Sequence, residues 1–337
     1  MAPSNLKATS PPTCRIPPGP INAAVEPKVN GFAREVVKGL LESPKRIDSK
    51  HLYDERGSKL FDKICQLPEY YLTRTEQEIM QANVADIVRE VGPNALLVEL
   101  GSGSSQKTRL LLDRLEAPRA YVPIDISAEH LRATARRLRA KYPALEVKPI
   151  VGDFTHQIEM PAGFADTSVC IYFPGSTIGN LPRDDAKKLL RIIADRCGQD
   201  GGLLIGFDLH KSKSVLEAAY NDSQGVTAAF SINLLRRLNR EANANFDIQR
   251  FRHVAFYNPS MSRIEIYLES IQDQVVRVGG GDISFARHER ILTEYSHKYT
   301  LAGFSEMAEE SGLTPTSVWL DQRNYFAVMY LEARDGS

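Results

Sequence analysis

The sequence has few cysteines, and they do not form a metal-binding pattern. Cys14, Cys65, Cys170 and Cys197 are widely spaced, with no CxxC motif and no clustered histidines. Structural zinc sites need such clusters, so the sequence argues against a bound metal. Isolated cysteines suit a reducing compartment, and we therefore expect a cytoplasmic protein.

The sequence also lacks an excess of charge and a long apolar run. Lys and Arg total 42, and Asp and Glu total 42, so no charge imbalance favours nucleic acid or anionic lipid. No apolar stretch approaches the roughly 18 residues that span a bilayer, and the N-terminus lacks the apolar core of a secretory signal. We expect a small-molecule substrate without nucleic-acid or membrane partners, and these features are compatible with a monomer.

Prolines are concentrated at the beginning of the chain. They occupy positions 3, 11, 12, 17, 18 and 20, with few large apolar residues beside them. Such a composition cannot bury enough apolar surface to fold. We expect residues 1–30 to form a disordered tail.

Short apolar segments alternate with helical patterns through the middle of the chain. The pattern predicts strands over 94–99, 120–126, 146–151, 168–173 and 202–208, and helices over 107–115, 128–141 and 184–197. This alternation is typical of an α/β fold with a doubly wound parallel sheet.

Different patterns flank this region. Before it, two helices are expected over 53–80, around a turn at Pro68. After it, a largely helical stretch over 215–240 precedes an antiparallel pair over 251–257 and 262–268. A helix over 301–311 then precedes strands over 316–320 and 325–331, which could close the sheet. The sequence therefore predicts a sheet domain interrupted by a second, inserted domain.

A glycine-rich segment, ELGSGSSQKT, follows the first predicted strand and begins at Glu99. Glycines such as Gly101 let the backbone approach a ligand closely, and the following helix N-terminus favours anionic groups. A phosphate-binding P-loop would need glycine at Gln106, and a dinucleotide site would need a third glycine among residues 104–106. The shorter G-x-G turn of S-adenosylmethionine-dependent methyltransferases remains, beside a tight turn that binds nothing.

Two acidic residues end the next two predicted strands. Asp125 lies where a carboxylate can accept hydrogen bonds from ribose hydroxyls. Asp153 could accept from the adenine amino group, while Phe154 packs on the base. Each alone could be a helix cap or turn residue. Together with the glycine turn, they favour a methyl-donor site.

Several long segments resemble one family. YDERGSKLFDKI, LPEYYLTRTEQEI, VELGSGSSQKT, FPGSTIGNL, LEAAYND followed by GVTAAF, and TEYSHKY are similar to the histidine-specific Nα-methyltransferases of ergothioneine biosynthesis. The resemblance covers about residues 32–331. It implies trimethylation of the α-amino group of L-histidine to hercynine, with S-adenosylmethionine as the donor.

The resemblance also implies roles for particular residues. Those implied for the donor are Gly101, Lys107, Asp125, Asp153 and Phe154; those implied for the amino acid are Tyr70, Asn180, Tyr220, Ile266, Glu294 and Ser296, with Tyr53 and Asn180 beside the reacting amine. It further implies a donor-binding domain over 76–210 and 299–337 and a substrate-binding domain over 31–75 and 211–298.

The chain departs from the family pattern at two positions. Ile266 stands where the family has methionine in the substrate pocket, and Tyr295 stands where asparagine is common. Alternate residues of an extended segment point to opposite sides, so Glu294 and Ser296 should share a face that Tyr295 does not. A carboxylate beside a hydroxyl can hold an imidazole, and we expect histidine to be the substrate.

Three alternatives remain from the sequence. The first keeps the chemistry and changes the substrate to tryptophan or another aromatic amino acid. The second is a non-catalytic sensor of S-adenosylmethionine, and the third is a nicotinamide dehydrogenase, which the missing third glycine disfavours.

Overall fold

The computed structural model describes residues 31–103, 107–164, 166–198 and 200–334. The expected tail over 1–30 and residues 104–106 of the glycine-rich segment lie outside the described residues. Within the described part of the chain, no helix is long and apolar enough to cross a bilayer. No group of three or more metal-ligating side chains gathers among those residues either.

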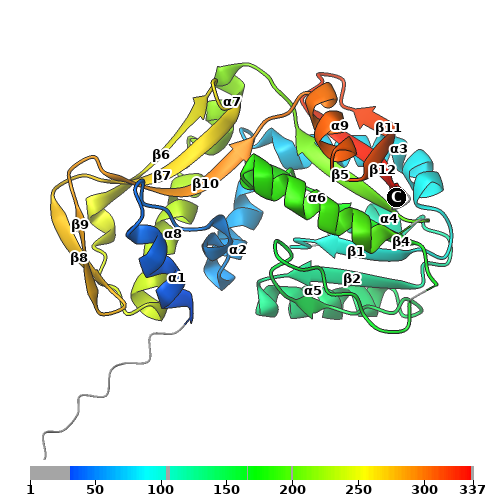
Figure 1. Cartoon of the computed structure of the whole chain (residues 1–337), viewed down its shortest axis with the longest axis horizontal. Helices are drawn as coiled ribbons and strands as arrows, with labels where there is room; N and C mark the ends of the chain where they lie inside the picture. Colours follow the sequence, from blue (N-terminus) through cyan, green and yellow to red (C-terminus); the bar gives the residue numbers. More distant parts are fainter. Residues whose placement is uncertain (1–30, 104–106, 165, 199, 335–337) are drawn as a thin grey trace, which may run out of the picture.

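A seven-stranded sheet, ordered β11-β12-β5-β4-β1-β2-β3, forms one end of the molecule (Figure 1). Its strands are β1 (Leu96–Leu100), β2 (Ala120–Asp125), β3 (Ile150–Val151), β4 (Val169–Phe173), β5 (Gly202–Asp208), β11 (Leu313–Leu320) and β12 (Phe326–Ala333). Strands β1 to β5 pair in parallel, and β12 pairs antiparallel to β5 and to β11. The predicted α/β class and the closure of the sheet by the last two strands are confirmed.

Helices cover both faces of this sheet. The helices of this region are α3 (Tyr71–Val91), α4 (Thr108–Leu112), α5 (Ala128–Lys141), α6 (Arg183–Cys197) and α9 (Leu301–Glu309). Alternate residues of β1 enter different cores: Leu97 packs in the cluster that contains α3, α4 and α5, whereas Val98 packs in the cluster that contains α6 and α9. Burial on both faces explains why these strands are continuous apolar runs.

The third predicted strand is shorter than expected. The pattern predicts a strand over 146–151, but β3 contains only Ile150 and Val151. A single bridge joins Val147 to Tyr121. Pro149 lies between the two pairings, and proline has no N–H to contribute to a ladder. The predicted strand is therefore wrong over most of its length.

A second group of elements lies beside the large sheet (Figure 1). It contains α1 (Gly31–Leu40), the 3-10 helix η1 (Ser49–Leu52), α2 (Glu55–Ile64), α7 (Lys213–Tyr220), α8 (Val226–Glu241), the 3-10 helix η3 (Ile248–Arg250), β6 (Phe251–Asn258), β7 (Arg263–Ser270), β8 (Gln274–Val278), β9 (Gly281–Phe285) and β10 (Arg290–His297). Strands β10, β7 and β6 form an antiparallel sheet, and β8 and β9 form a hairpin. The predicted antiparallel pair is confirmed as β6 and β7.

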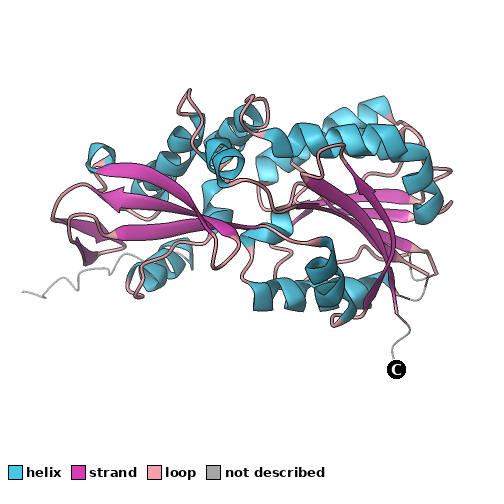
Figure 2. Ribbon diagram, turned by 90° about the horizontal axis from the view of Figure 1, so that it is seen from above, coloured by secondary structure: helices cyan, strands magenta, loops and turns pink. Residues whose placement is uncertain are grey.

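Strand β10 connects the two groups. Its residues pair with β7 in the smaller sheet, and the chain then reaches the end of β5, where the Tyr299 N–H donates to the Asp208 carbonyl over 2.9 Å. Figure 2 shows the two sheets from above, with helices packed around each. The carboxyl ends of the parallel strands therefore face the smaller sheet.

Candidate functional site

Two cavities meet at the carboxyl ends of the parallel strands. The first, called here the sheet-edge cavity, has an empty volume of ≈ 980 Å³ and is lined by residues that include Gly101, Asp125, Asp153 and Phe154. The second, called here the inner cavity, has an empty volume of ≈ 540 Å³ and lies between the large sheet and the smaller one. Both cavities are lined by aromatic and apolar side chains with a few polar groups among them, as small-molecule sites are.

Gly101 forms the turn that opens the sheet-edge cavity. Its φ is +67°, a left-handed conformation that favours glycine. Its N–H donates to the Ile124 carbonyl over 2.9 Å, which holds the turn against β2. A Cβ at Gly101 would lie 3.7 Å from the Phe154 ring, so the missing side chain leaves the ring face accessible.

Asp125 supplies a carboxylate at the end of β2. Its Oδ2 accepts from the Gly103 N–H over 3.0 Å, and its Oδ1 accepts from the Ser127 N–H over 2.8 Å. An ionised carboxylate can accept about four hydrogen bonds. Asp125 therefore keeps acceptor capacity on both oxygens for a ligand in the cavity.

Asp153 supplies a second carboxylate, after β3. Its Oδ1 accepts from the N–H and hydroxyl of Thr155 over 3.0 and 2.5 Å, and its Oδ2 accepts from Lys50 Nζ over 3.3 Å. Burial alone would raise the pKa of Asp153, but the Thr155 bonds and the Lys50 charge outweigh it and lower the pKa. The carboxylate stays ionised and retains room for one further donor.

Phe154 is held edge-on against Phe173, the last residue of β4, with ring centroids 5.5 Å apart. This contact fixes the ring beside the Gly101 turn, where a flat apolar group could pack on it.

Lys107 does not line either cavity. Its ammonium pairs with Glu76, a fully buried carboxylate of α3, which also accepts from the Gly175 N–H over 3.0 Å. A buried carboxylate needs a cationic partner, and this need explains the position of Lys107. Its implied contact with the methyl donor stays a prediction.

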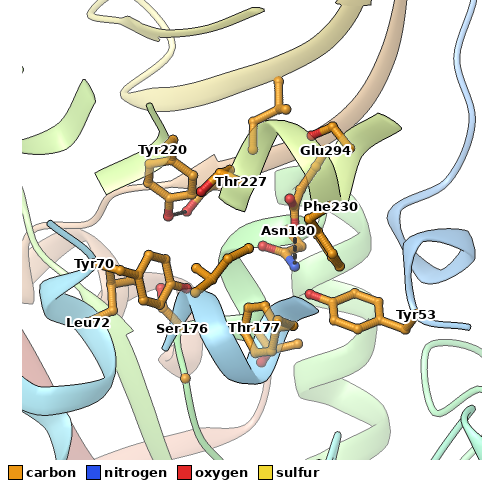
Figure 3. Close-up of a pocket in the computed structure, with 16 residues that line it drawn as sticks. Tyr53, Tyr70, Leu72, Ser176, Thr177, Asn180, Tyr220, Thr227, Phe230 and Glu294 are labelled. Carbon is orange, nitrogen blue, oxygen red and sulfur yellow. Dashed lines mark hydrogen bonds between the residues drawn. The ribbon is translucent and has the colours of Figure 1, made fainter. Parts of the chain in front are cut away.

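The inner cavity brings together side chains from distant parts of the chain (Figure 3). All the residues that the sequence assigned to the amino acid line it: Tyr53, Tyr70, Asn180, Tyr220, Ile266, Glu294 and Ser296. They come from both groups of elements, so the cavity exists only in the assembled fold.

Asn180 and Glu294 are in direct contact at the wall of this cavity (Figure 3). The Asn180 side-chain amide donates to Glu294 Oε1 over 3.0 Å. Gly179 permits this approach, because a Cβ there would lie 2.9 Å from the His297 carbonyl oxygen of β10. Burial raises the pKa of Glu294 to about 7, and the nearby Lys298 charge opposes that rise.

The alternation predicted around residue 295 is observed. Glu294 and Ser296 both line the inner cavity, whereas the Tyr295 ring stacks on the Arg263 guanidinium at 3.6 Å. The substitution of tyrosine at position 295 therefore changes a cation–π contact of the smaller sheet and leaves the cavity lining unchanged.

Aromatic rings form much of the inner wall. The Tyr53 ring meets Phe230 and Phe61 edge-on, with centroids 5.4 and 5.5 Å apart, and the Tyr70 ring meets Tyr220 at 6.0 Å. Burial raises the pKa values of Tyr53 and Tyr70 well above the usual range. Both phenols are therefore neutral near pH 7 and act as hydrogen-bonding groups, not as bases.

Four residues line both cavities and form their common wall: Tyr53, Phe61, Thr177 and Asn180. A ligand in one cavity would therefore contact the same side chains as a ligand in the other. This arrangement suits transfer of a small group between two bound molecules.

Sequence reasoning missed several lining residues. Phe61, Thr177 and Phe230 line the inner cavity without having been assigned a role, and Lys50 lines the sheet-edge cavity. Phe61, Thr177 and Phe230 lie inside the quoted segments, but a helical or turn pattern does not show which of its residues faces a cavity formed with another element.

Comparison with known proteins identifies the family. The model of a family described as "Histidine-specific methyltransferase, SAM-dependent" matches residues 32–333. The chain belongs to this family. As a member, it is a methyltransferase whose methyl donor is S-adenosylmethionine.

Three relatives place this methyltransferase among its neighbours. Histidine N-alpha-methyltransferase from Mycolicibacterium smegmatis is 39% identical, over 90% of this chain and 96% of that protein. Ergothioneine biosynthesis protein 1 from Neurospora crassa is 29% identical, over 84% of this chain and 33% of that protein. An L-tryptophan methyltransferase from Psilocybe serbica is 28% identical, over 89% of this chain and 92% of that protein.

Proposed function

We propose that this methyltransferase transfers three methyl groups in succession to the α-amino group of L-histidine and forms hercynine, the first step of ergothioneine biosynthesis. One observation carries the proposal: a half-buried carboxylate, Glu294, lies in the inner cavity, which shares a wall with the sheet-edge cavity. Family membership and the relative from Mycolicibacterium smegmatis support it.

We also propose a division of labour between two domains. Residues 76–210 and 299–337 bind the donor, and residues 31–75 and 211–298 bind and cover the amino acid. The two sheets support this division. One hydrophobic cluster nevertheless runs through both parts, from Leu97 of β1 to Leu234 of α8 and Leu268 of β7, so we expect the domains to unfold together.

The sheet-edge cavity is the proposed donor site. S-adenosylmethionine supplies a methyl group activated by its sulfonium sulfur. The free acceptor capacity of Asp125 suits ribose hydroxyls, that of Asp153 suits the adenine amino group, and the Phe154 ring suits packing on the base. Gly101 leaves room for a close approach of the nucleoside.

Tyr53 and Asn180 are the proposed partners of the reacting amine, because both lie in the common wall. The amine must be neutral to act as a nucleophile, although even a chain-terminal α-amino group titrates at roughly 8, so much of the amine arrives protonated. Partial desolvation in a closed cavity favours the neutral form. Since the Tyr53 phenol stays protonated, its role is to orient the amine.

The rest of the inner cavity is assigned to the carboxylate and the ring. Tyr70 and Tyr220 suit the carboxylate, because neutral phenols can donate hydrogen bonds to it. Glu294 and Ser296 suit the imidazole nitrogens, with Ile266 against the ring. Buried polar groups of this kind reject a ligand that leaves them unpaired.

Mass spectrometry tests this function. Purified protein incubated with L-histidine and isotopically labelled S-adenosylmethionine should give mono-, di- and trimethylated products. A competition among the twenty amino acids should leave histidine as the main labelled product. Absence of label on every amino acid would overturn the proposal.

Tryptophan is the second candidate substrate. The relative from Psilocybe serbica and the apolar Ile266 favour it, whereas Ser296 offers a hydroxyl that can pair with the bare nitrogen of an imidazole and finds no such acceptor on an indole. Parallel assays on the two amino acids decide between them. The cytoplasmic location, the monomeric state and the absence of a nucleic-acid partner stay predictions.

A further inference from the structure

A lysine ammonium lies directly behind two hydroxyls of the inner cavity. Lys298, the residue after β10, is fully buried. Its Nζ donates to the Ser296 hydroxyl over 2.7 Å and to the Tyr220 hydroxyl over 3.1 Å, and it pairs with Asp208 Oδ2 over 2.7 Å. Ser296 and Tyr220 line the cavity, and Lys298 does not.

The ammonium is held in its charged form. Burial favours the neutral amine, but the Asp208 carboxylate and the hydrogen bonds outweigh burial and raise the pKa of Lys298. Asp208 is fully buried at the end of β5. It also accepts from the Tyr71 hydroxyl over 2.7 Å and from Lys211 Nζ over 2.6 Å, so the carboxylate is shared between two lysines.

The hydrogens of this cluster can be counted. An ammonium has three N–H groups and no acceptor, and Lys298 directs them at Asp208, Tyr220 and Ser296. Both hydroxyl oxygens therefore accept from Lys298, and their own hydrogens must point elsewhere. The two oxygens lie 2.7 Å apart, so one hydrogen can join them, and at least one remains for the cavity.

We propose that Lys298 is a positioning residue that makes the hydroxyl pair of Tyr220 and Ser296 a hydrogen-bond donor toward the substrate. The inference rests on the proposed function and deepens it. When the Tyr220 hydroxyl donates to Ser296, the Ser296 hydrogen is left for the cavity and fits the bare nitrogen of the neutral histidine ring. Glu294, on the same strand as Ser296, has the opposite character and accepts the ring N–H when ionised.

The donor pattern selects one form of the ring. A neutral imidazole has one N–H and one bare nitrogen, which match a carboxylate and a hydroxyl donor respectively. An imidazolium has two N–H groups and would leave the Ser296 donor unmatched. Lys298 thereby contributes to specificity without touching the substrate.

Two matched variants test the assignment. Lys298→Met and Lys211→Met each remove one buried ammonium from Asp208, but only Lys298 contacts the two hydroxyls. Calorimetry with S-adenosylhomocysteine present should show histidine binding weakened about tenfold or more in Lys298→Met, as expected for a hydrogen-bond network polarised by a charge. Lys211→Met should change histidine affinity less than about threefold.

A third variant separates positioning from a general effect on the fold. Lys298→Met should weaken histidine binding clearly less when it is added to Ser296→Ala than when it is added to the wild type. In the Ser296→Ala protein, one of the two hydroxyls through which Lys298 acts on the substrate is already absent. Affinity for S-adenosylhomocysteine should be the same in all variants. If Lys298→Met does not fold, Lys298→Gln, which keeps a shorter neutral donor, is measured in its place.

Equal losses in Lys298→Met and Lys211→Met, or strictly additive losses with Ser296→Ala, would overturn the inference. A wild-type protein that binds no histidine would instead overturn the proposed function. The two failures are therefore distinguishable.

Discussion

Glu294 is the side chain on which substrate choice depends most directly. Its carboxyl group accepts a hydrogen bond from the Asn180 side-chain amide in the inner cavity, and burial raises its pKa to about 7. Near neutral pH it is therefore divided between a carboxylate, which accepts a ring N–H, and a carboxylic acid, which can donate. A change at this position alters both the shape and the hydrogen-bonding character of the cavity.

Replacing Glu294 with alanine should reduce kcat/KM for histidine by roughly 10- to 100-fold, since hydrogen bonds to charged groups contribute about 1.5–3 kcal/mol. The space released should favour a larger apolar side chain such as that of tryptophan. Steady-state kinetics on both amino acids measure the shift. Glu294→Gln keeps the volume and is the matched control, and an unchanged preference in Glu294→Ala would show that this residue does not select the substrate.

Glu99 of β1 provides a prediction about pH and stability. It is almost fully buried and accepts hydrogen bonds from the Thr108 hydroxyl over 2.6 Å and from the Tyr121 hydroxyl. Burial raises its pKa from 4.5 to about 7, although both hydroxyls oppose the rise. The folded state therefore holds a proton that the unfolded state has lost, and the free energy of unfolding should fall as pH rises from about 4.5 to about 7.

Glu99→Gln removes this titration. Its stability relative to the wild type should improve by about 2 kcal/mol, and at most about 3 kcal/mol, between pH 5 and pH 8. Urea unfolding at the two pH values gives the difference. A difference between variant and wild type that does not depend on pH would show that Glu99 is ionised throughout.

Much of the site was predictable from residue identity and order along the chain. Asp125, Asp153 and Phe154 follow successive strands of a parallel sheet, and such ends meet at one edge; all three line the same cavity. Lys298 was not predictable as a partner of Tyr220, because 78 positions separate them and no periodic pattern links positions so far apart.

At the scale of elements, strong apolar periodicity predicted the bounds of helices and strands well, whereas weaker sequence signals did not. The predicted helix over 128–141 coincides with α5, and the predicted strand over 202–208 coincides with β5. The hairpin of β8 and β9 was missed, although alternating apolar residues flank a glycine-rich turn there, which is a known hairpin signal. Strand β10 was anticipated only as an extended segment.

Asp54 ties two elements together beside the site. It is the N-cap of α2 and accepts from the Gly57 N–H over 2.7 Å. It also accepts from Asn233 and Arg240 of α8, each over 2.7 Å. The residue before it, Tyr53, lies in the common wall of the two cavities.

Asp54→Ala should lower the free energy of unfolding by about 2 kcal/mol, because a cap, the partly buried hydrogen bond from Asn233 and the exposed ion pair with Arg240 are lost. It should also raise the KM for histidine, since Tyr53 loses its fixed neighbour. Asp54→Asn retains a good capping residue and should lose less on both counts. Equal stability of the alanine and asparagine variants would contradict the capping role.

At the scale of the whole molecule, the shared wall predicts communication between the two ligands. A molecule in the sheet-edge cavity would restrict the same side chains, Tyr53, Phe61, Thr177 and Asn180, that the amino acid contacts. When the first ligand has already ordered these side chains, the second ligand loses less conformational entropy on binding.

S-adenosylhomocysteine should therefore tighten histidine binding by about fivefold or more. Calorimetric titration of histidine, with and without the nucleoside, measures the factor. Thermodynamic linkage requires histidine to tighten the nucleoside by the same factor, which provides an internal control. Independent binding of the two ligands would show that the common wall is already rigid.

The path of β10 has a consequence for how such enzymes diversify. One continuous stretch carries Glu294 and Ser296 into the cavity, places the Lys298 ammonium behind the Ser296 hydroxyl, and joins Tyr299 to the end of β5. Exchanging this stretch between relatives, without changing its length, would transfer the preference for one substrate ring over another in a single step. An insertion or deletion within it would displace the side chains that bind the substrate and also the connection between the two sheets. We therefore expect this stretch to change by substitution at constant length.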